Sequence, residues 1–424
     1  MPLAVATAIG LGFIVPGVAD YIVSAGRNIP HPDIAEDYLR ACFWAVVFGV
    51  LVVYLPVPSR DKPALLFLWI VKCGVALGAM LWYERHYAAL DAYWYFADAT
   101  HGTFSDQPVR IGFGTENVSV LADRLARVVG RSFHSLKLAF SLMGLWAVYL
   151  FYRAGVRASG RENPRVLIVL GLVPTVLFWS TTFGKEPIAL LGIGLYTWGV
   201  VSWQRSGRLH YAAAIVAGVV VATLIRLWLG PLLLAPVAWL AFRAERRWYR
   251  RALYTSAVLA GLAVAITSFR AYFQLESARD LLETTDRVSR AWAYGGSGQV
   301  IGYEFTSFGR ILAFLPIGMF TALFRPLPGE VMNPFGLLAG VENVVLLCLL
   351  ALALYRSRRA HWVDPLVQWG ITLVLLWSAI YGIVSYQNLG TAVRFKLQIL
   401  PLLVGLLLYL AFTQAVDHGT ERKT

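Results

Sequence analysis

The sequence is poor in charge and in cysteine, and it has no long polar stretch. Only 14% of its 424 residues are Asp, Glu, Lys or Arg, whereas 58% are hydrophobic. Soluble domains typically hold about 25% charged and about 45–50% apolar residues, so this composition excludes a soluble globular protein. The aromatic residues are spread along the whole chain, which also excludes a soluble domain with a single membrane anchor. The composition predicts a polytopic membrane protein.

The few cysteines and histidines predict neither disulfides nor a metal centre. Cys42, Cys73 and Cys348 all lie inside apolar runs, and the spacing of the histidines matches no metal-binding motif. No basic segment or small-residue cleavage site precedes Arg27, so we expect the first apolar run to be a retained helix and not a signal peptide.

Apolar runs of about twenty residues, the length that crosses a hydrocarbon core of about 30 Å, set the predicted topology. They predict an all-α, multi-pass fold in which residues 1–424 form one transmembrane domain of about twelve helices. The run 308–325 is also apolar, but Pro316 interrupts it, and we expect residues 309–336 to be interfacial or re-entrant. Spans are expected at 3–24, 40–58, 64–83, 135–152, 165–183, 187–203, 211–226, 228–242, 252–269, 337–355, 365–384 and 397–415.

The distribution of Lys and Arg predicts which side of the membrane each loop faces. Six segments together carry eighteen Lys or Arg against six Asp or Glu, nearly all of the formal net charge of +13. Short cytoplasmic loops are enriched in basic residues, so we expect both termini to be cytoplasmic. The basic segments are 58–63, 153–165, 204–210, 243–251, 356–364 and 416–424.

Two long segments, 84–134 and 270–308, are then extracytoplasmic, where long loops usually carry function. The first is expected to contain an amphipathic helix on the outer surface, and the second ends in the glycine-rich stretch 294–302, which we expect to be a mobile loop or lid. In the amphipathic helix, the apolar positions Val118, Leu121, Leu125 and Val128 lie opposite Asp123, Arg124, Arg127 and Arg131.

Asp91 begins an aromatic-rich stretch just beyond the third expected span. A carboxylate at an apolar boundary among aromatic rings suits an acid/base role, although an exposed carboxylate at the start of a short helix is the alternative. Asp98 lies seven residues on, which places it on nearly the same helical face. A divalent ion bridging Asp91 to a phosphate remains open as a further role for this residue.

Basic residues at the expected outer boundary suggest an anion site. Lys185 and Glu186 are neighbours at the start of a helix, where the positive end of the helix dipole adds to the ammonium charge; a snorkelling lysine is the alternative. Arg226, Arg394 and Lys396 also run against the positive-inside bias. Lys72 lies deeper and needs a carboxylate or carbonyl partner, for which Glu342, Glu330 and Asp20 are the options.

One motif resembles a known family. Asp91-Ala92-Tyr93-Trp94-Tyr95-Phe96-Ala97-Asp98-Ala99 is similar to the first-external-loop motif of GT-C-type membrane glycosyltransferases, in which an aspartate precedes an aromatic and then a small residue. Asp91, Tyr95 and Ala99 match, while Ala92 stands where a second acidic residue often follows. Segments around 114–130, 172–199, 322–347 and 388–402 also resemble a bacterial group of such proteins in order and spacing.

The resemblance implies a reaction and roles for these residues. It implies an inverting glycosyltransferase that moves a sugar from a polyprenyl-phosphate donor to a glycan or glycolipid acceptor of the cell envelope. It also implies that the protein lies in the inner (plasma) membrane of a bacterium, with the active site on the extracytoplasmic side. Asp91, with Asp98 in reserve, would be the catalytic base. The donor phosphate would be bound by Lys185, Arg226, Arg394 and Lys396, and the substrate by Tyr93, Tyr95, Glu186 and Trp292, although interfacial anchoring also explains these aromatics.

Two other functions fit the same composition. A polysaccharide polymerase or ligase would use a polyprenyl-diphosphate oligosaccharide, held by Arg279, Arg287 and Arg290. A lipid-linked sugar transporter or flippase would need interrupted helices in two related halves, with ionisable groups at the midplane. Donor preference separates the first two, and flux without a glycosyl product indicates the third.

Overall fold

The computed structural model describes residues 17, 20–244, 247–291, 293, 297–299 and 301–413. Within these ranges all regular secondary structure is helical, and the one β-type pairing is an isolated bridge between Gly298 and Asn388. The expected all-α fold is therefore confirmed for the described residues. The chain divides into unit 1, Met1–Trp146 with Ser180–Ile188, and unit 2, Ala147–Trp179 with Ala189–Thr424.

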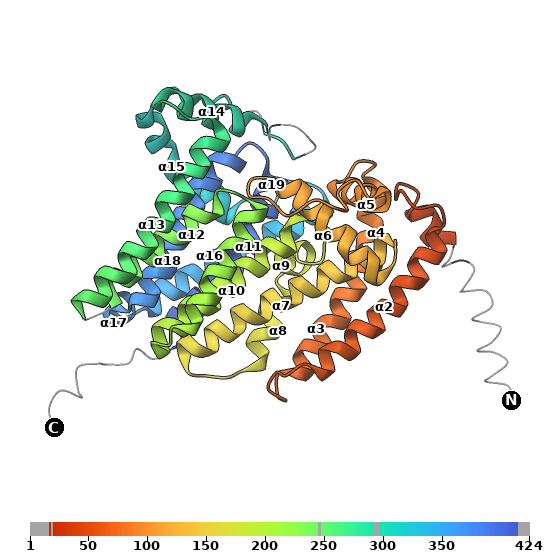
Figure 1. Cartoon of the computed structure of the whole chain (residues 1–424), viewed down its shortest axis with the longest axis horizontal. Helices are drawn as coiled ribbons and strands as arrows, with labels where there is room; N and C mark the ends of the chain where they lie inside the picture. Colours follow the sequence, from red (N-terminus) through yellow and green to blue (C-terminus); the bar gives the residue numbers. More distant parts are fainter. Residues whose placement is uncertain are drawn as a thin grey trace. The chain divides into compact units, whose positions relative to one another are not determined.

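Unit 1 holds two long antiparallel helical segments, two shorter helices and the first half of a long one. Helix α2 packs against α3, and α5 packs against α6 (Figure 1). A π-helical turn, η1, joins α3 to α4, so the three form one continuous helical segment. The elements are α2 (Ile34–Tyr54), α3 (Lys62–Gly74), η1 (Val75–Ala79), α4 (Met80–His86), α5 (Asp91–His101), α6 (Gly114–Val129) and the start of α7 (Phe133–Ser159).

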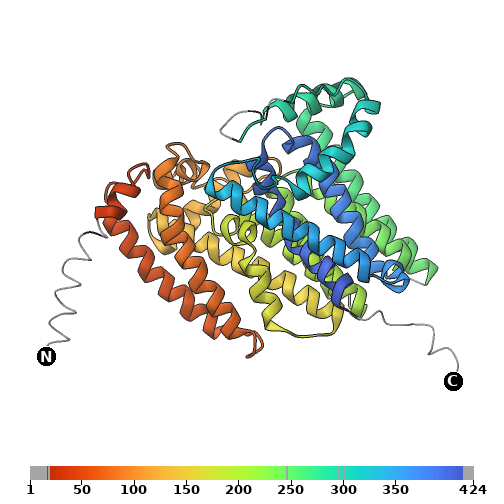
Figure 2. The same cartoon turned by 180° about the vertical axis from the view of Figure 1, so that it is seen from behind.

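Unit 2 is a bundle in which α12 packs on α13 and α18, and α15 packs on α18. Figures 1 and 2 show α14 lying across the ends of α13 and α15. The elements beyond α7 are α8 (Pro164–Leu172), α9 (Pro174–Trp179), α10 (Lys185–Ser206), α11 (His210–Ile225), α12 (Leu229–Ala244), α13 (Trp248–Phe273), α14 (Ala278–Ala291), α15 (Phe308–Phe324), α16 (Pro334–Arg356), α17 (Arg359–Val363), α18 (Pro365–Ser385), α19 (Leu389–Lys396) and α20 (Leu400–Phe412).

Capping residues fix where many helices begin. The Asp33 carboxylate accepts from the backbone N–H of Glu36 at the start of α2, and Asn388 does the same for Thr391 at the start of α19. Such caps satisfy backbone N–H groups that have no partner inside the helix. Proline occupies the first turn of α3, α8, α16, α18 and α20, where its missing N–H costs nothing.

In the part of the chain that the structure describes, six helical segments are long and apolar enough to cross a membrane. They are Ile34–Tyr54, Lys62–His86, Phe133–Ser159, Trp248–Phe273, Pro334–Arg356 and Pro365–Ser385, and the bent pair α19 and α20, at 66° to each other, is a seventh by the same measure. Helices α11, α12 and α15 are apolar but shorter. The count of twelve spans stays a prediction, and its first span, 3–24, lies mostly outside the described residues.

The exposed apolar surface of α13 fits a helix that is surrounded by lipid. This helix has 26 residues and buries none of them, and the side chains of Leu253, Leu259 and Val264 are 63%, 50% and 65% exposed. Exposing so much apolar area to water costs about 25 cal/mol per Å². A helix that is apolar yet unburied is stable when lipid replaces water around it, as expected of a membrane protein.

Two sequence expectations about helix continuity are wrong. The run 165–183 is not one helix, because the backbone is extended at Val173, the residue before Pro174, and this separates α8 from α9. Conversely, Pro316 does not break the run 308–325: it lies inside the continuous helix α15, which ends at Phe324 as expected. The helix packs tightly on its neighbour at this point, since Gly318 approaches the Gly382 backbone of α18 closely.

Candidate functional site

Helix α5 presents the predicted carboxylates on one face. It starts after the extended residue Leu90, with Asp91 in the first turn near the positive end of the helix dipole, and Gly102 ends it with φ +67°. Asp91 is exposed, while Asp98, two turns on, is half-buried. The Ser119 hydroxyl of α6 donates to Asp98 Oδ2 at 2.8 Å. Asp98 thus joins two helices, and Asp91 is the more exposed of the two carboxylates.

The expected amphipathic helix is confirmed as α6, but its buried face is rotated from the prediction. Val118, Ala122, Ala126 and Val129 are buried, whereas Val128 is 68% exposed. The Asp123 side chain is nearly buried and receives an Arg127 hydrogen bond at 2.7 Å. The sequence prediction placed the large aliphatic side chains on the buried face of this helix. In the structure, small alanines occupy part of that face, and α6 packs against α5.

The turn 180–184 and the start of α10 lie against α5 within unit 1. The Tyr95 ring packs on Phe183, with 6.1 Å between ring centroids. A Cβ on Gly184 would lie 3.9 Å from the Tyr95 ring and 3.2 Å from Glu186 Oε2, so glycine keeps this junction tight. Tyr95 is one helical turn beyond Asp91, so the two residues lie on the same side of α5.

Lys185 and Glu186 face different surroundings at this N-terminus. Lys185 is half-buried and its ammonium donates to Thr115 Oγ1 of α6 at 2.7 Å, whereas Glu186 is 1% exposed. The first turn of a helix also directs its backbone N–H groups outward. Unit 1 therefore gathers an exposed carboxylate, a cation and a helix N-terminus on α5, α6 and α10, which is the chemistry needed for a base beside an anion.

The remaining predicted substrate residues lie elsewhere. Tyr93 is only 7% exposed and donates to the Glu84 carbonyl at 3.1 Å, and burial raises the pKa of its phenol. Its ring packs against Phe133, with 5.6 Å between ring centroids, so Tyr93 helps to hold α5 in place and does not face a ligand. Trp292 lies outside the described residues.

In unit 2, the three predicted cations cluster around the short helix α19. The Arg394 guanidinium lies 5.5 Å from the Trp179 ring centre, and the Arg226 guanidinium lies 4.3 Å from that of Phe395. Arg226 is 7% exposed and Arg394 is half-buried. Stacking on aromatic rings stabilises the charge of a guanidinium in an apolar surrounding.

Lys396 is held in a buried ion pair. It is fully buried, lies 3.2 Å from Glu342 Oε1 and donates to Asn343. The other Glu342 oxygen accepts from the Thr175 backbone N–H at the start of α9, at 2.7 Å. This pair neutralises the charge of Lys396, so the lysine fixes α19 against α16 and α9, and Arg394 and Arg226 are the cations of this cluster suited to an external anion.

The segment before α15 is tied to α19. The Ser297 carbonyl accepts from Leu389 N–H at 3.1 Å, Gln299 N–H donates to the Gln387 carbonyl at 2.6 Å, and Ser297 Oγ donates to Asn388 Oδ1 at 2.9 Å. Residues 297–299 of the glycine-rich stretch are thus joined to the residues at the start of α19 by hydrogen bonds, and the expected lid stays a prediction. This segment joins α14 and α15 to the cationic cluster.

The arginines considered for a diphosphate donor are engaged along α14. Arg279 pairs with Glu283 at 2.8 Å, and Arg290 pairs with Asp286 at 2.8 Å and with Glu304 at 3.2 Å. The Arg287 guanidinium donates to Thr284 at 3.3 Å. With its acidic residues interleaved, α14 presents mixed charge, which does not favour a polyphosphate site.

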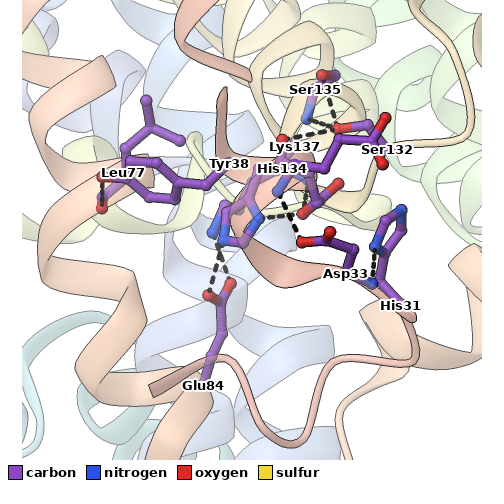
Figure 3. Close-up of polar contacts among 11 residues, drawn as sticks. His31, Asp33, Tyr38, Leu77, Glu84, Ser132, His134, Ser135 and Lys137 are labelled. Carbon is purple, nitrogen blue, oxygen red and sulfur yellow. Dashed lines mark hydrogen bonds and ion pairs between the residues drawn. The ribbon is translucent and has the colours of Figure 1, made fainter. Parts of the chain in front are cut away.

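A buried charged cluster in unit 1 was missed by sequence reasoning. Lys137 of α7 donates to Glu84 Oε1 of α4 at 2.7 Å, and His134 of α7 pairs with Asp37 of α2. The two pairs approach where His134 Nε2 lies 3.9 Å from Glu84 Oε2, as Figure 3 shows. Neither of these two atoms has a hydrogen-bond partner. The spans predicted at 40–58 and 64–83 ended short of Asp37 and Glu84, so neither residue was recognised as lying inside a helix.

Lys72 has a partner of the carbonyl type. Its buried ammonium donates to the Ser180 carbonyl at 3.0 Å and to the Ser180 and Thr181 hydroxyls at 2.6 and 2.9 Å. The suggested carboxylates pair elsewhere, Glu342 with Lys396 and Glu330 with Arg325. Gly144 of α7 packs against the same Ser180 carbonyl, so Lys72 holds the turn that precedes Lys185.

Among the described residues, no group of three or more His, Cys, Asp or Glu side chains is arranged so that it could hold a metal ion. Ala92 follows Asp91 where a second carboxylate would help to hold a divalent ion, so the residues around Asp91 do not form a metal site by themselves.

Comparisons with known proteins found no match to this chain. No family model, curated protein or solved structure matches this chain. Its function is therefore inferred from side-chain chemistry.

Proposed function

We propose that this membrane protein is an inverting glycosyltransferase that moves a sugar from a polyprenyl-phosphate donor to an acceptor hydroxyl, with Asp91 as general base. One observation carries the proposal: within unit 1, the exposed carboxylate of Asp91 shares a helix face with Tyr95, which packs beside Lys185 at the N-terminus of α10. The GT-C resemblance of the Asp91–Ala99 motif supports the same assignment.

The chemistry follows from these groups. Asp91 accepts the proton of the acceptor hydroxyl while that oxygen attacks the anomeric carbon of the sugar. The bond between the anomeric carbon and the phosphate oxygen breaks, and its electron pair leaves with the polyprenyl phosphate. The leaving phosphate gains negative charge, which a cation and a helix N-terminus stabilise. Lys185 supplies that cation in unit 1.

The cationic cluster of unit 2 is a second anion-binding group. Arg394 and Arg226 carry the charge, while the Lys396–Glu342 pair fixes α19. Substituting Lys185 and Arg394 separately tests each unit by itself. The purified protein would be incubated with polyprenyl monophosphate and with polyprenyl diphosphate, and complexes counted by native mass spectrometry.

We expect the monophosphate to bind selectively, and Lys185→Ala or Arg394→Ala to weaken it. Each lost charge-assisted contact costs about 1.5–3 kcal/mol, which is about ten- to a hundredfold in affinity. Preferential binding of the diphosphate would favour a polymerase or ligase, and binding that neither variant alters would show that the cations are misassigned.

Turnover tests the base directly. Asp91→Asn keeps the size of the side chain but removes its basicity, so we expect transfer to fall by about 10²–10⁴-fold. Asp106→Asn, which alters another exposed aspartate of unit 1, is the matched control and should leave transfer unchanged. If purified Asp91→Asn protein of normal thermal stability transfers sugar as fast as the unmodified chain, Asp91 is not the base.

A further inference from the structure

Unit 2 contains an elongated apolar groove that the proposed reaction does not use. Its volume is about 460 Å³, within the range of about 300–1,000 Å³ that is typical of small-molecule sites. It lies between the second half of α7, the start of α8, the end of α10, the start of α18 and one face of α20. The residues of α20 that line it are Pro401, Leu402, Gly405, Leu406, Leu408, Tyr409 and Phe412, with Thr413 directly after the helix.

Small residues form part of the groove wall. Gly155 of α7 and Gly405 of α20 both line it, and a Cβ added at either position would meet no atom within 4 Å. The backbone itself is therefore exposed to the groove at these two places. A side chain that begins at either glycine therefore enters the groove from its wall.

The groove has the length of a lipid chain in one leaflet. The residues that line it on α20 run from Pro401 to Thr413. At 1.5 Å per residue they extend over about 18 Å, close to half of the hydrocarbon core of about 30 Å. A hydrocarbon chain therefore matches both the length and the apolar character of this space.

One end of the groove is polar and carries a net positive charge. Arg161, Asn163, Arg205 and Asp364 line it there, where α7 and α20 end and α8 and α18 begin. Arg205 pairs with Asp364 at 3.2 Å, and Tyr409 donates to the same carboxylate oxygen at 3.3 Å. The Arg161 guanidinium makes no hydrogen bond or ion pair with another described residue. Two arginines and one carboxylate therefore give this polar end, the mouth of the groove, a net charge of +1.

We propose that this groove binds an anionic phospholipid, with one acyl chain along α20 and the headgroup phosphate at Arg161. A phosphodiester headgroup without an ammonium carries one negative charge and matches the net charge of the mouth. A zwitterionic headgroup adds a cation beside Arg161 and Arg205, which like-charge repulsion disfavours. The lipid would join five helices of unit 2 at the end where the basic segments lie.

Native mass spectrometry of the purified full-length protein tests this site, with phosphatidylglycerol, phosphatidylcholine and glycerol 3-phosphate as probes. We expect one phosphatidylglycerol to be retained. Gly405→Leu or Gly155→Leu should weaken it by about tenfold or more, since each displaced methylene contributes about a fourfold factor. Arg161→Gln should weaken it by about two- to fivefold, the range for an exposed ion pair, and should reduce the preference over phosphatidylcholine.

Gly74→Leu is the matched control, because Gly74 is a glycine of α3 in unit 1 at which a Cβ also meets no atom within 4 Å. It should leave lipid retention unchanged. The proposal is overturned if Gly405→Leu and Gly155→Leu, with the thermal stability of the unmodified chain, both retain phosphatidylglycerol normally. It is equally overturned if phosphatidylcholine binds as well as phosphatidylglycerol, or if glycerol 3-phosphate displaces the lipid fully, which would indicate an anion site without a chain. If the glycine variants fail to fold, the effect of Arg161→Gln on headgroup preference decides.

Discussion

At the scale of single residues, this protein buries charges in pairs. Lys137 with Glu84 and Lys396 with Glu342 are each at most 6% exposed. Removing one member of a buried pair leaves the other charge without compensation, which costs more than removing both. Such pairs therefore fix how helices meet, since any other arrangement would leave a charge in an apolar surrounding.

The Lys137–Glu84 pair gives a direct test of this principle. We expect Lys137→Met to lower the free energy of unfolding by about 3–5 kcal/mol, because it leaves Glu84 uncompensated. The double variant Lys137→Met with Glu84→Gln should recover part of that loss. Thermal unfolding in detergent measures both. A double variant no more stable than the single one would show that the charge of Glu84 is balanced by other groups.

The exposed pair Arg40–Glu36, whose side chains are 50% and 53% exposed on α2, serves as the control. Water already screens these charges, so Arg40→Met should change stability by only about 0.3–0.5 kcal/mol. An equal loss at Arg40 and Lys137 would contradict the assignment of the stabilisation to burial.

At the scale of elements, α12 and α13 differ in how their apolar side chains are surrounded. Helix α12 has side chains buried in protein, whereas α13 has apolar side chains on the outer surface, where we expect lipid. Leu240 of α12 is fully buried, whereas Val264 of α13 is 65% exposed on a helix without a buried residue. Burial in protein creates specific packing that truncation destroys. When a side chain that faces lipid or detergent is truncated, lipid or detergent fills the space, so the loss of stability is small.

We therefore expect Leu240→Ala to destabilise the protein by about 2–5 kcal/mol, the cost of a cavity in a packed core. Val264→Ala should remain within about 0.5 kcal/mol, as is usual away from packed sites. Thermal unfolding of the two purified variants in one detergent is the measurement. A large loss for Val264→Ala would mean that this face of α13 is covered by protein, for example by a second copy of the chain.

At the scale of the whole molecule, the distribution of charge predicts which side of the membrane each loop faces. The basic loops around Arg208 and Arg358 are expected in the cytoplasm, and the segment around Asp106 outside. Single cysteines at Asp106 and Arg208, in a chain whose three native cysteines are replaced by alanine, test this in intact cells. A membrane-impermeant maleimide should label position 106 at once and position 208 only after permeabilisation. Labelling of both in intact cells would contradict the expected crossings.

The sequence by itself predicted a helical membrane protein. Composition and the length of apolar runs are sufficient for this prediction, because both depend only on the preference of each residue for lipid or water. The sequence also located the Asp91 motif, the amphipathic helix at 114–129 and the basic residues around 185 and 394, since these are local patterns. Arg325-Pro326 correctly predicted the end of α15 at Phe324, whereas α2 begins at Ile34, six residues before its expected span.

Only the tertiary structure decided which side chains face one another. It paired Lys396 with Glu342 and Asn343, placed Lys72 against Ser180 and Thr181, joined Glu84 to Lys137, and turned Tyr93 inward. These contacts join residues 9 to 109 positions apart, so no spacing in the sequence encodes them. A buried charge must find a partner, but which partner it finds depends on how the helices pack, and that is a property of the folded chain.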